Sequence, residues 1–257
     1  MPVEYVDFEA ARAASGLRMV VVPGVPSPWG EAAKGILHVK RIPWLAVRLD
    51  QANEAMAEWT GERSGPVAMY DDEAPRGGFI DILMLAERLR PSPSLLPGDP
   101  AARALVIGLS HEICGEMGLG WCRRNASVHA GINEGEAGFP KGVALYLAAK
   151  YGYRAEEADA YTRRVVGILD MLAARLDAQR EAGFGYLVGD ALTAADIYSA
   201  AFMALLAPLP PEQCPMPEAM RAAFGTLDTA TAAALDPALI EHRDRIYAEH
   251  LELPLSL

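Results

Sequence analysis

The stretch Gly189-Asp190-Ala191-Leu192-Thr193-Ala194-Ala195-Asp196-Ile197 decides the fold of this chain, because it has the pattern of a helix start. As the N-cap residue, Thr193 can accept a hydrogen bond from the backbone amide of Asp196, and the carboxylate of Asp196 can accept one from the amide of Thr193. The helix dipole also favours an acidic side chain in the first turn. The stretch therefore predicts a capped helix over 193–206.

The rest of the C-terminal half is predicted to be helical as well. Between Glu156 and Ala182, apolar residues recur at spacings of three and four, which lines one face of a long helix that Gly183 can end. Weaker patterns predict further helices over 101–124, 140–151, 218–235 and 237–250. We expect no strand in this half.

The N-terminal half has a different pattern, in which short strands alternate with helices. Strand-like runs occupy 18–22, 44–49 and 67–70, and helical segments occupy 30–40, 52–58 and 80–89. This order predicts a small α/β domain with helices packed on a sheet. The proline-rich residues 91–100 can form neither a helix interior nor a central strand, so we place a linker there, between a domain over 1–90 and a domain over 101–257.

The composition is that of a folded chain with an acidic surface. Of its 257 residues 51% are hydrophobic, and 23 Lys and Arg against 34 Asp and Glu give a net charge of −11. That charge repels nucleic-acid phosphates and anionic lipids, and no apolar run reaches the roughly 18 residues of a membrane helix. We therefore expect no nucleic-acid partner, no membrane insertion and, since the N-terminus lacks a signal-peptide pattern, a cytoplasmic location.

The stretch over 189–197 resembles the Gly-Asp-x-Leu-Thr-x-Ala-Asp-Ile segment that opens a core helix in the C-terminal domain of cytosolic glutathione transferases. Ser27-Pro28-Trp29-Gly30 is similar to the Ser-Pro-aromatic loop of tau-class and several bacterial transferases. Gly65-Pro66-Val67 lies just before the third predicted strand, where the family has a cis-proline. The resemblance implies a thioredoxin-like N-terminal α/β domain followed by an all-α C-terminal domain.

The resemblance implies that Ser27 is the catalytic residue. Pro28 suits a first helical turn, so Ser27 falls at or beside the N-cap. A hydroxyl that donates to the sulfur of glutathione there would lower the thiol pKa from its usual value near 8.5 and increase the fraction of nucleophilic thiolate. The other interpretation is that Ser27 only caps the helix. Tyr5 is an alternative hydroxyl, which we interpret as structural because it lies well before the first predicted strand.

The residues that the resemblance implies for glutathione binding are Trp29, Gly65, Pro66, Val67 and Arg76. The Gly65–Pro66 peptide bond is predicted to be cis. The Glu-Ser pair with which the family holds the γ-glutamyl group maps to about Gly78-Phe79, and neither residue can replace it. Arg76 could bind a carboxylate instead, with an acidic neighbour in 71–73 for the ammonium group, or it could be a solvated loop arginine. Trp29 could also line an apolar substrate pocket together with Trp121, or only pack in the core.

The cysteines of this chain do not suggest a cysteine-dependent thiol transferase. Omega-class transferases and glutaredoxins have a cysteine in the loop where this chain has Ser27, whereas Cys114, Cys122 and Cys214 all follow residue 100. His111 shares a predicted helix face with the first two cysteines, but no fourth ligand is spaced to complete a zinc site. We therefore expect no metal.

The resemblance as a whole implies a glutathione transferase-like enzyme. It would use glutathione as co-substrate and activate its thiol for addition to, displacement on or isomerisation of a small apolar electrophile. The alternative is a transferase-like binding or regulatory module without catalysis, which the missing Glu-Ser pair permits. The resemblance also implies a homodimer, for which the glycines and apolar residues of 101–119 offer a surface for close packing.

Overall fold

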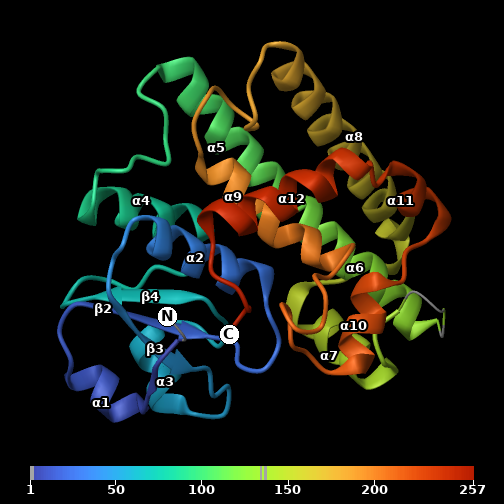
Figure 1. Ribbon diagram of the computed structural model, residues 1–257. Coiled ribbons are helices and arrows are strands. Elements are labelled where there is room, and N and C mark those ends of the chain that lie inside the picture. The colour runs from blue at the N-terminus through green and yellow to red at the C-terminus, as the bar shows by residue number, and fades with distance from the viewer. Residues whose placement is uncertain (1–2, 134, 136–137) are drawn as a thin grey trace.

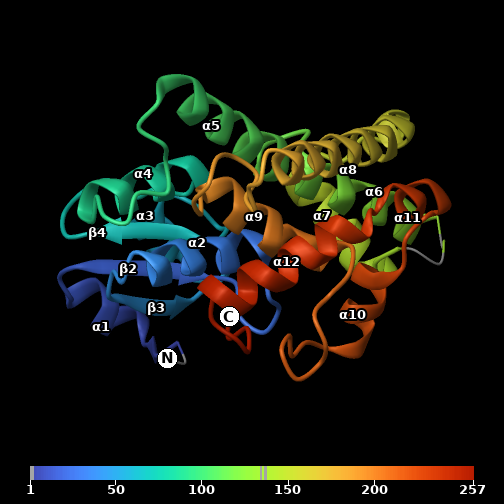
Figure 2. The ribbon, with the colours of Figure 1, turned by 45° about the horizontal axis from the view of Figure 1, so that its top comes forward.

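The computed structural model describes residues 3–133, 135 and 138–257, and it consists of an α/β half followed by a helical half (Figures 1 and 2). The sheet has four strands in the order β1-β3-β2-β4. Their bounds are Tyr5–Val6 for β1, Leu17–Val21 for β2, Trp44–Arg48 for β3 and Val67–Tyr70 for β4. β3 is parallel to both β1 and β2, whereas β4 is antiparallel to β2.

Helices cover both faces of this sheet, with α2 and α4 on one face and α1 and α3 on the other (Figure 1). Their bounds are Phe8–Ala13 for α1, Pro28–Val39 for α2, Glu54–Thr60 for α3 and Phe79–Leu89 for α4. Strand residues alternate between the two cores: Met19 packs with the buried residues of α2 and α4, and Val20 packs with those of α1 and α3. The α/β class predicted for this half is confirmed.

Two elements at the start of the chain escaped prediction. β1 has two residues, too few to show an alternating pattern, and α1 follows it directly. The side chain of Asp7 caps α1, because its Oδ1 accepts a hydrogen bond of 2.8 Å from the amide of Ala10. Tyr5 thus lies within a strand of the sheet, and the expectation that it precedes the first strand is wrong.

The second half is helical, and no described residue after 100 lies in a strand, as predicted. The α-helices are α5 (Pro100–Cys114), α6 (Leu119–Ile132), α7 (Lys141–Tyr151), α8 (Ala158–Glu181), α9 (Ala194–Phe202), α10 (Glu218–Gly225), α11 (Thr229–Ala234) and α12 (Pro237–His250). α9 lies at the centre, in contact with α2, α5 and α12 (Figure 2). It therefore joins the helical half to the sheet half.

For two of the predicted helices, the prediction of one continuous helix is wrong. The helix expected over 101–124 breaks between α5 and α6, where Met117 has a φ of 58° and a side chain at Gly115 would lie 2.8 Å from the carbonyl of His111. The helix expected over 218–235 breaks between α10 and α11. There Asp228 starts a new helix by accepting a 2.9 Å hydrogen bond from the amide of Thr231.

The start of α9 has the predicted capping box between Thr193 and Asp196. Oδ2 of Asp196 accepts from the backbone amide of Thr193 at 2.9 Å and from its hydroxyl at 2.7 Å. Oδ1 accepts from the amide of Leu187 at 2.7 Å, a contact that the sequence did not predict. Asp196 is fully buried, so this carboxylate fixes the loop before α9 as well as the helix.

The proline-rich segment over 91–100 joins α4 to α5 and forms hydrogen bonds with both halves of the chain. Leu95 is buried, and its carbonyl accepts a 2.9 Å hydrogen bond from the amide of Ala194 at the start of α9. The buried Lys40 forms an ion pair of 2.7 Å with Glu87 and donates to the carbonyl of Pro93 at 2.8 Å. The division into two domains at this segment stays a prediction.

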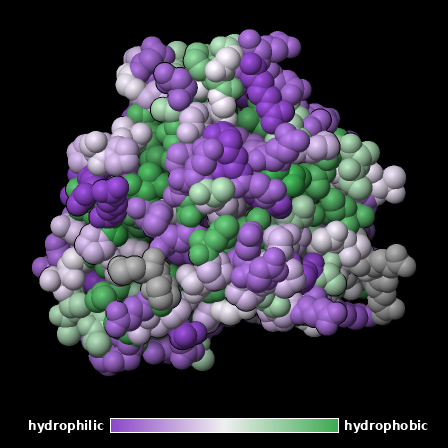
Figure 3. Space-filling model, in the orientation of Figure 1, coloured by the Kyte–Doolittle hydropathy of each residue, from purple (hydrophilic) through white to green (hydrophobic). Residues whose placement is uncertain are grey.

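The outer face of the helical half is largely hydrophilic around α12, as Figure 3 shows. The inner face of α12 is buried through Leu239 and Ile246. Within the described part of the chain, no helix combines the length and the apolar character needed to cross a membrane.

Candidate functional site

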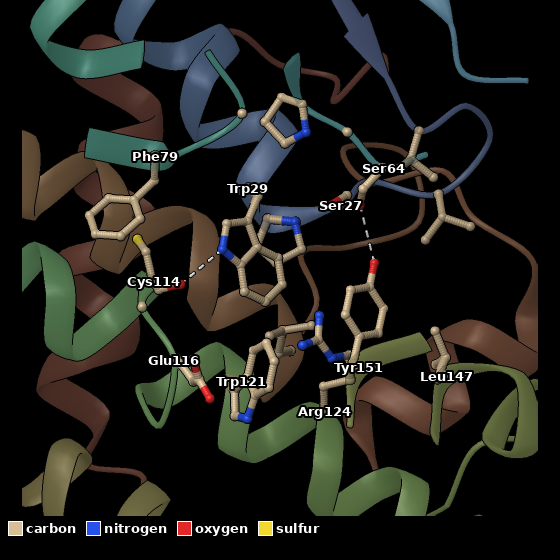
Figure 4. Close-up of a pocket in the computed structure, with 18 of the residues that line it drawn as sticks. Ser27, Trp29, Ser64, Phe79, Cys114, Glu116, Trp121, Arg124, Leu147 and Tyr151 are labelled. Carbon is tan, nitrogen blue, oxygen red and sulfur yellow. Dashed lines mark hydrogen bonds between the residues drawn. The ribbon is translucent and has the colours of Figure 1, made fainter. Parts of the chain in front are cut away.

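A cavity of about 530 Å³ lies between the sheet half and the helical half. Its walls come from the loops after β2 and before β4, from the start of α4, and from α5, α6, α7 and α10. Figure 4 shows the central side chains. The residues that line the cavity include Ser27, Trp29, Glu62, Ser64, Gly65, Pro66, Gly77, Gly78, Phe79, Cys114, Glu116, Trp121, Arg124 and Tyr151.

Four of the six predicted site residues line this cavity, namely Ser27, Trp29, Gly65 and Pro66. The side chain of Val67 is instead buried in the smaller core of the sheet. Arg76 is also absent from the lining residues, and its guanidinium pairs with Glu73 at 2.5 Å. Glu73 accepts from Arg88 as well, and these hydrogen bonds lower the pKa of its carboxyl. Arg76 therefore has an intramolecular partner.

Ser27 is the N-cap residue of α2, yet its hydroxyl makes no capping hydrogen bond. Its carbonyl accepts the first helical hydrogen bond, at 2.8 Å from the amide of Glu31. Glu31 is buried, pairs with Lys34 at 2.6 Å and accepts a 3.2 Å hydrogen bond from the amide of Leu257. These contacts hold the start of α2 in place, and Ser27 lines the cavity with a hydroxyl that is not used to cap the helix.

The Gly65–Pro66 peptide bond is cis, as predicted. A side chain at position 65 would meet backbone, because its Cβ would lie 3.2 Å from the carbonyl oxygen of Val20 and 3.3 Å from the amide of Val22. Glycine therefore lets this loop lie against the end of β2, directly beside the loop that carries Ser27.

The start of α4 forms another wall of the cavity, and there Gly77 and Gly78 leave room for neighbouring carboxylates. A Cβ at position 77 would overlap the carboxylate of Glu62, and one at position 78 would lie 2.6 Å from Oδ2 of Asp81. Gly78 is the N-cap residue and has no side chain to cap the helix. The hydroxyl of Tyr198 in α9 donates to the carbonyl of Phe79 at 2.9 Å and so fixes this wall. Sequence reasoning missed Glu62, although the paired glycines were the signal.

Trp29 links the two halves across the cavity. Its indole Nε1 donates to the carbonyl of Cys114 at 3.0 Å, and its ring packs edge to face on Phe202 of α9 at 4.7 Å. Trp121 forms another edge-to-face pair, with Tyr151 at 6.2 Å. Both tryptophans line the same cavity, and both also pack against the large core, so the two alternatives raised for them are compatible.

Arg124 of α6 lies among these rings (Figure 4). Its guanidinium carbon is 3.7 Å from the ring centre of Tyr151, 4.8 Å from that of Trp121 and 5.3 Å from that of Trp29. Burial lowers the pKa of this guanidinium to about 10, so it remains a cation at neutral pH. Sequence reasoning missed Arg124 and Tyr151. Their contact depends on how α6 packs on α7, and no sequence motif predicts that packing.

The other candidate groups are poorly suited to chemistry in the cavity. Cys114 reaches the cavity wall, but burial raises the pKa of its thiol well above the ordinary value, so it is uncharged at neutral pH. Tyr5 packs its ring against Arg48 at 3.9 Å and is not among the lining residues. Among the described residues, no three His, Cys, Asp or Glu side chains come together as metal ligands.

Comparisons with known proteins bear on this architecture. Residues 139–224 match the family described as glutathione S-transferase, C-terminal domain. No curated protein sequence matches the chain significantly.

Solved structures with the same fold cover nearly the whole chain. A glutathione S-transferase from Methylobacterium radiotolerans, in complex with glutathione sulfonate, is 20% identical with a TM-score of 0.60, over 91% of this chain and 92% of its own. A glutathione transferase family member from Pseudomonas fluorescens, with two glutathione bound, is 16% identical with a TM-score of 0.59, over 93% and 94%. A β-etherase from Sphingobium is 19% identical with a TM-score of 0.54, over 89% and 99%.

The order of a four-stranded mixed sheet and a helical half, the matched C-terminal domain and these structural likenesses agree with one another. The chain therefore has the glutathione S-transferase fold, a thioredoxin-like α/β half followed by an all-α half, and residues 139–224 are similar to the C-terminal domain of glutathione S-transferases.

Proposed function

We propose that this protein is a glutathione-dependent transferase that activates the glutathione thiol with Ser27 for reaction with a small aromatic electrophile. The observation that carries this proposal is that Ser27, whose hydroxyl makes no capping hydrogen bond at the start of α2, lines the same cavity as the cis Gly65–Pro66 peptide. A hydroxyl donor at a helix N-terminus favours a thiolate over a thiol, because both the hydrogen bond and the helix dipole stabilise negative charge.

Glutathione would lie along the sheet side of the cavity. Its peptide would meet the backbone at Gly65 and Pro66, and its sulfur would lie against Ser27. The γ-glutamyl end is an amino acid with one ammonium and one carboxylate group. The carboxylate of Glu62 offers a partner for the ammonium group, and the backbone amides at the uncapped start of α4 offer donors for the carboxylate.

This arrangement replaces the Glu-Ser pair that the sequence lacks. Glu62 comes from the loop after α3, and its carboxylate occupies the space that a side chain at Gly77 would fill. Glycine at position 77 thus makes room for a carboxylate from another loop. The proposal needs no contact from Arg76, whose guanidinium is paired with Glu73.

The electrophile would bind on the helical side, where aromatic and aliphatic side chains dominate the lining. Trp29, Trp121 and Tyr151 form one end of this surface, and Phe139 and Phe224 belong to the other residues of the wall. One of the structural neighbours is a β-etherase, so this fold occurs in an enzyme whose name refers to an ether substrate. Homodimer formation through 101–119 is part of the proposal and is tested by sedimentation.

The test of the proposed function is binding and turnover by the whole chain. Calorimetry should show glutathione binding at one site per chain, and 1-chloro-2,4-dinitrobenzene should be converted only in the presence of glutathione. Binding without turnover of aryl halides, epoxides or enones would favour a binding module. Failure of both by a folded protein would refute glutathione as co-substrate.

The role of Glu62 gives a separate prediction. Glu62→Gln should raise the Kd for glutathione about tenfold or more, because a charge-assisted hydrogen bond contributes about 1.5–3 kcal/mol. The same change should leave the Kd unaltered for the glutathione analogue that lacks the α-ammonium group. Arg76→Ala, a loss of charge beside the same wall, is the matched control and should leave both values unchanged. Equal weakening of both ligands by Glu62→Gln would contradict the assignment.

A further inference from the structure

Arg124 is a cation in the cavity wall without an anionic partner among the described residues. Its Nε and Nη2 are buried and have no hydrogen-bond partner. Removing two guanidinium nitrogens from water without giving them an acceptor is costly, and the three surrounding rings offset only part of that cost. The cavity side is where the missing partner can enter.

The charges around this guanidinium favour an anion. Lys150 of α7 lies 5.3 Å from the centre of the Tyr151 ring, so two cations flank that ring. Glu116 also lines the cavity, but Figure 4 shows its carboxylate on the other side of Trp121, and it forms no ion pair with Arg124. Two cations therefore lie near the Tyr151 ring, although the chain as a whole has a net charge of −11.

The rings around Arg124 define the shape of the partner. Trp29 and Trp121 offer apolar faces at the same end of the cavity, and Trp29 lies two residues after Ser27 in the first turn of α2. A ligand that packs on these ring faces and also pairs with the Arg124 guanidinium has a flat apolar body with an anionic group at one end. Carboxylate fits the fork of a guanidinium with two parallel hydrogen bonds.

We propose that Arg124 selects an aromatic electrophile that carries a carboxylate, with the ring held by Trp29 and Trp121 and the carboxylate bound by the guanidinium. This proposal names the substrate class for the proposed transferase, and it rests on that function only for the reaction and not for the binding. The low local polarity of the site strengthens the ion pair relative to one in water.

The binding experiment uses 3-nitrobenzoate and 3-nitrobenzamide, which differ in charge but hardly in shape, and follows the quenching of tryptophan fluorescence without glutathione. The wild type should bind the carboxylate at least tenfold more tightly than the amide. Arg124→Gln should abolish this preference, and Arg124→Lys should keep part of it. Arg154→Gln, which removes a guanidinium that is 66% exposed, should keep all of it and controls for the change in net charge.

The turnover experiment uses 4-chloro-3-nitrobenzoate and 4-chloro-3-nitrobenzamide with glutathione. Arg124→Gln should raise KM for the benzoate tenfold or more and leave KM for the benzamide unchanged. No charge preference in the wild type, or an equal loss for both ligands in Arg124→Gln, would overturn the proposal and make Arg124 a structural residue. Arg124→Gln could also keep the preference for the benzoate and raise the pKa of bound glutathione. That result would overturn the proposal, because it would assign Arg124 to the thiolate. Charge-selective binding by a chain that binds no glutathione would support the anion site and refute the transferase.

Discussion

Replacing Asp196 by alanine should destabilise the protein by about 3–5 kcal/mol, because a buried charged acceptor is removed from the groups that it satisfies. Its two oxygens accept from the amides of Leu187 and Thr193 and from the Thr193 hydroxyl. In the variant both amides would remain buried without a partner. The ring of His242, whose Nε2 lies 3.2 Å from Oδ1 without hydrogen-bond geometry, would lose its electrostatic contact as well.

The measurement is the free energy of unfolding from a urea titration. Asp190→Ala is the matched control, since this exposed aspartate lies in the same loop and should change stability by less than about 0.5 kcal/mol. Thr193→Ala should cost about 1 kcal/mol, because the Asp196 carboxylate keeps both backbone amides as donors. An unfolding midpoint of Asp196→Ala equal to that of the wild type would show that the loop before α9 does not depend on this carboxylate.

The effect of Asp196 should extend to the site, because α9 holds two of the cavity walls. Tyr198 fixes the start of α4 through the carbonyl of Phe79, and Phe202 packs on Trp29. Gly120 of α6 lets α9 approach closely, since a side chain there would overlap the ring of Phe202. The motif that decides the fold therefore also sets the distance between the two sides of the cavity.

Local sequence patterns were sufficient for the elements that are long or strongly capped. The apolar spacing of α8 and the strand of Val67–Tyr70 follow from residues that are neighbours in sequence. The helix breaks near Gly115 and Asp228 were harder to predict. A glycine only weakens a helix, and an aspartate caps one only where the chain has already turned. β1 depends on its pairing with β3, a contact distant in sequence.

The site was predictable to the extent that it is built from loop motifs. Ser27, Trp29, Gly65 and Pro66 lie in short motifs and do line one cavity. Arg124 lies in no such motif. From sequence alone an arginine on a helix is expected at the surface, and only the packing of α2, α6 and α7 places it among aromatic rings. Glu62 escaped for the related reason that its loop meets Gly77 only in three dimensions.

Replacing Ser27 by alanine should lower glutathione-dependent turnover at neutral pH by about 10- to 100-fold. The hydroxyl would donate to the thiolate, and a hydrogen bond to a charged group contributes about 1.5–3 kcal/mol. Without it the pKa of the bound thiol rises, so the increase of rate with pH moves to higher pH. The two profiles should converge once the pH exceeds both thiol pKa values. The measurement is kcat/KM against pH, together with the thiolate absorbance of bound glutathione.

The structure separates this catalytic role from a capping role. Because the Ser27 hydroxyl makes no capping hydrogen bond, Ser27→Ala should change the free energy of unfolding by less than about 0.5 kcal/mol. Ser27→Thr keeps the hydroxyl and should restore most of the turnover. Ser64→Ala removes another hydroxyl from the same cavity, one that lies 3.4 Å from the Tyr151 hydroxyl, and should leave the pH profile in place. An unshifted profile for Ser27→Ala, or the same shift for Ser64→Ala, would remove Ser27 from the reaction.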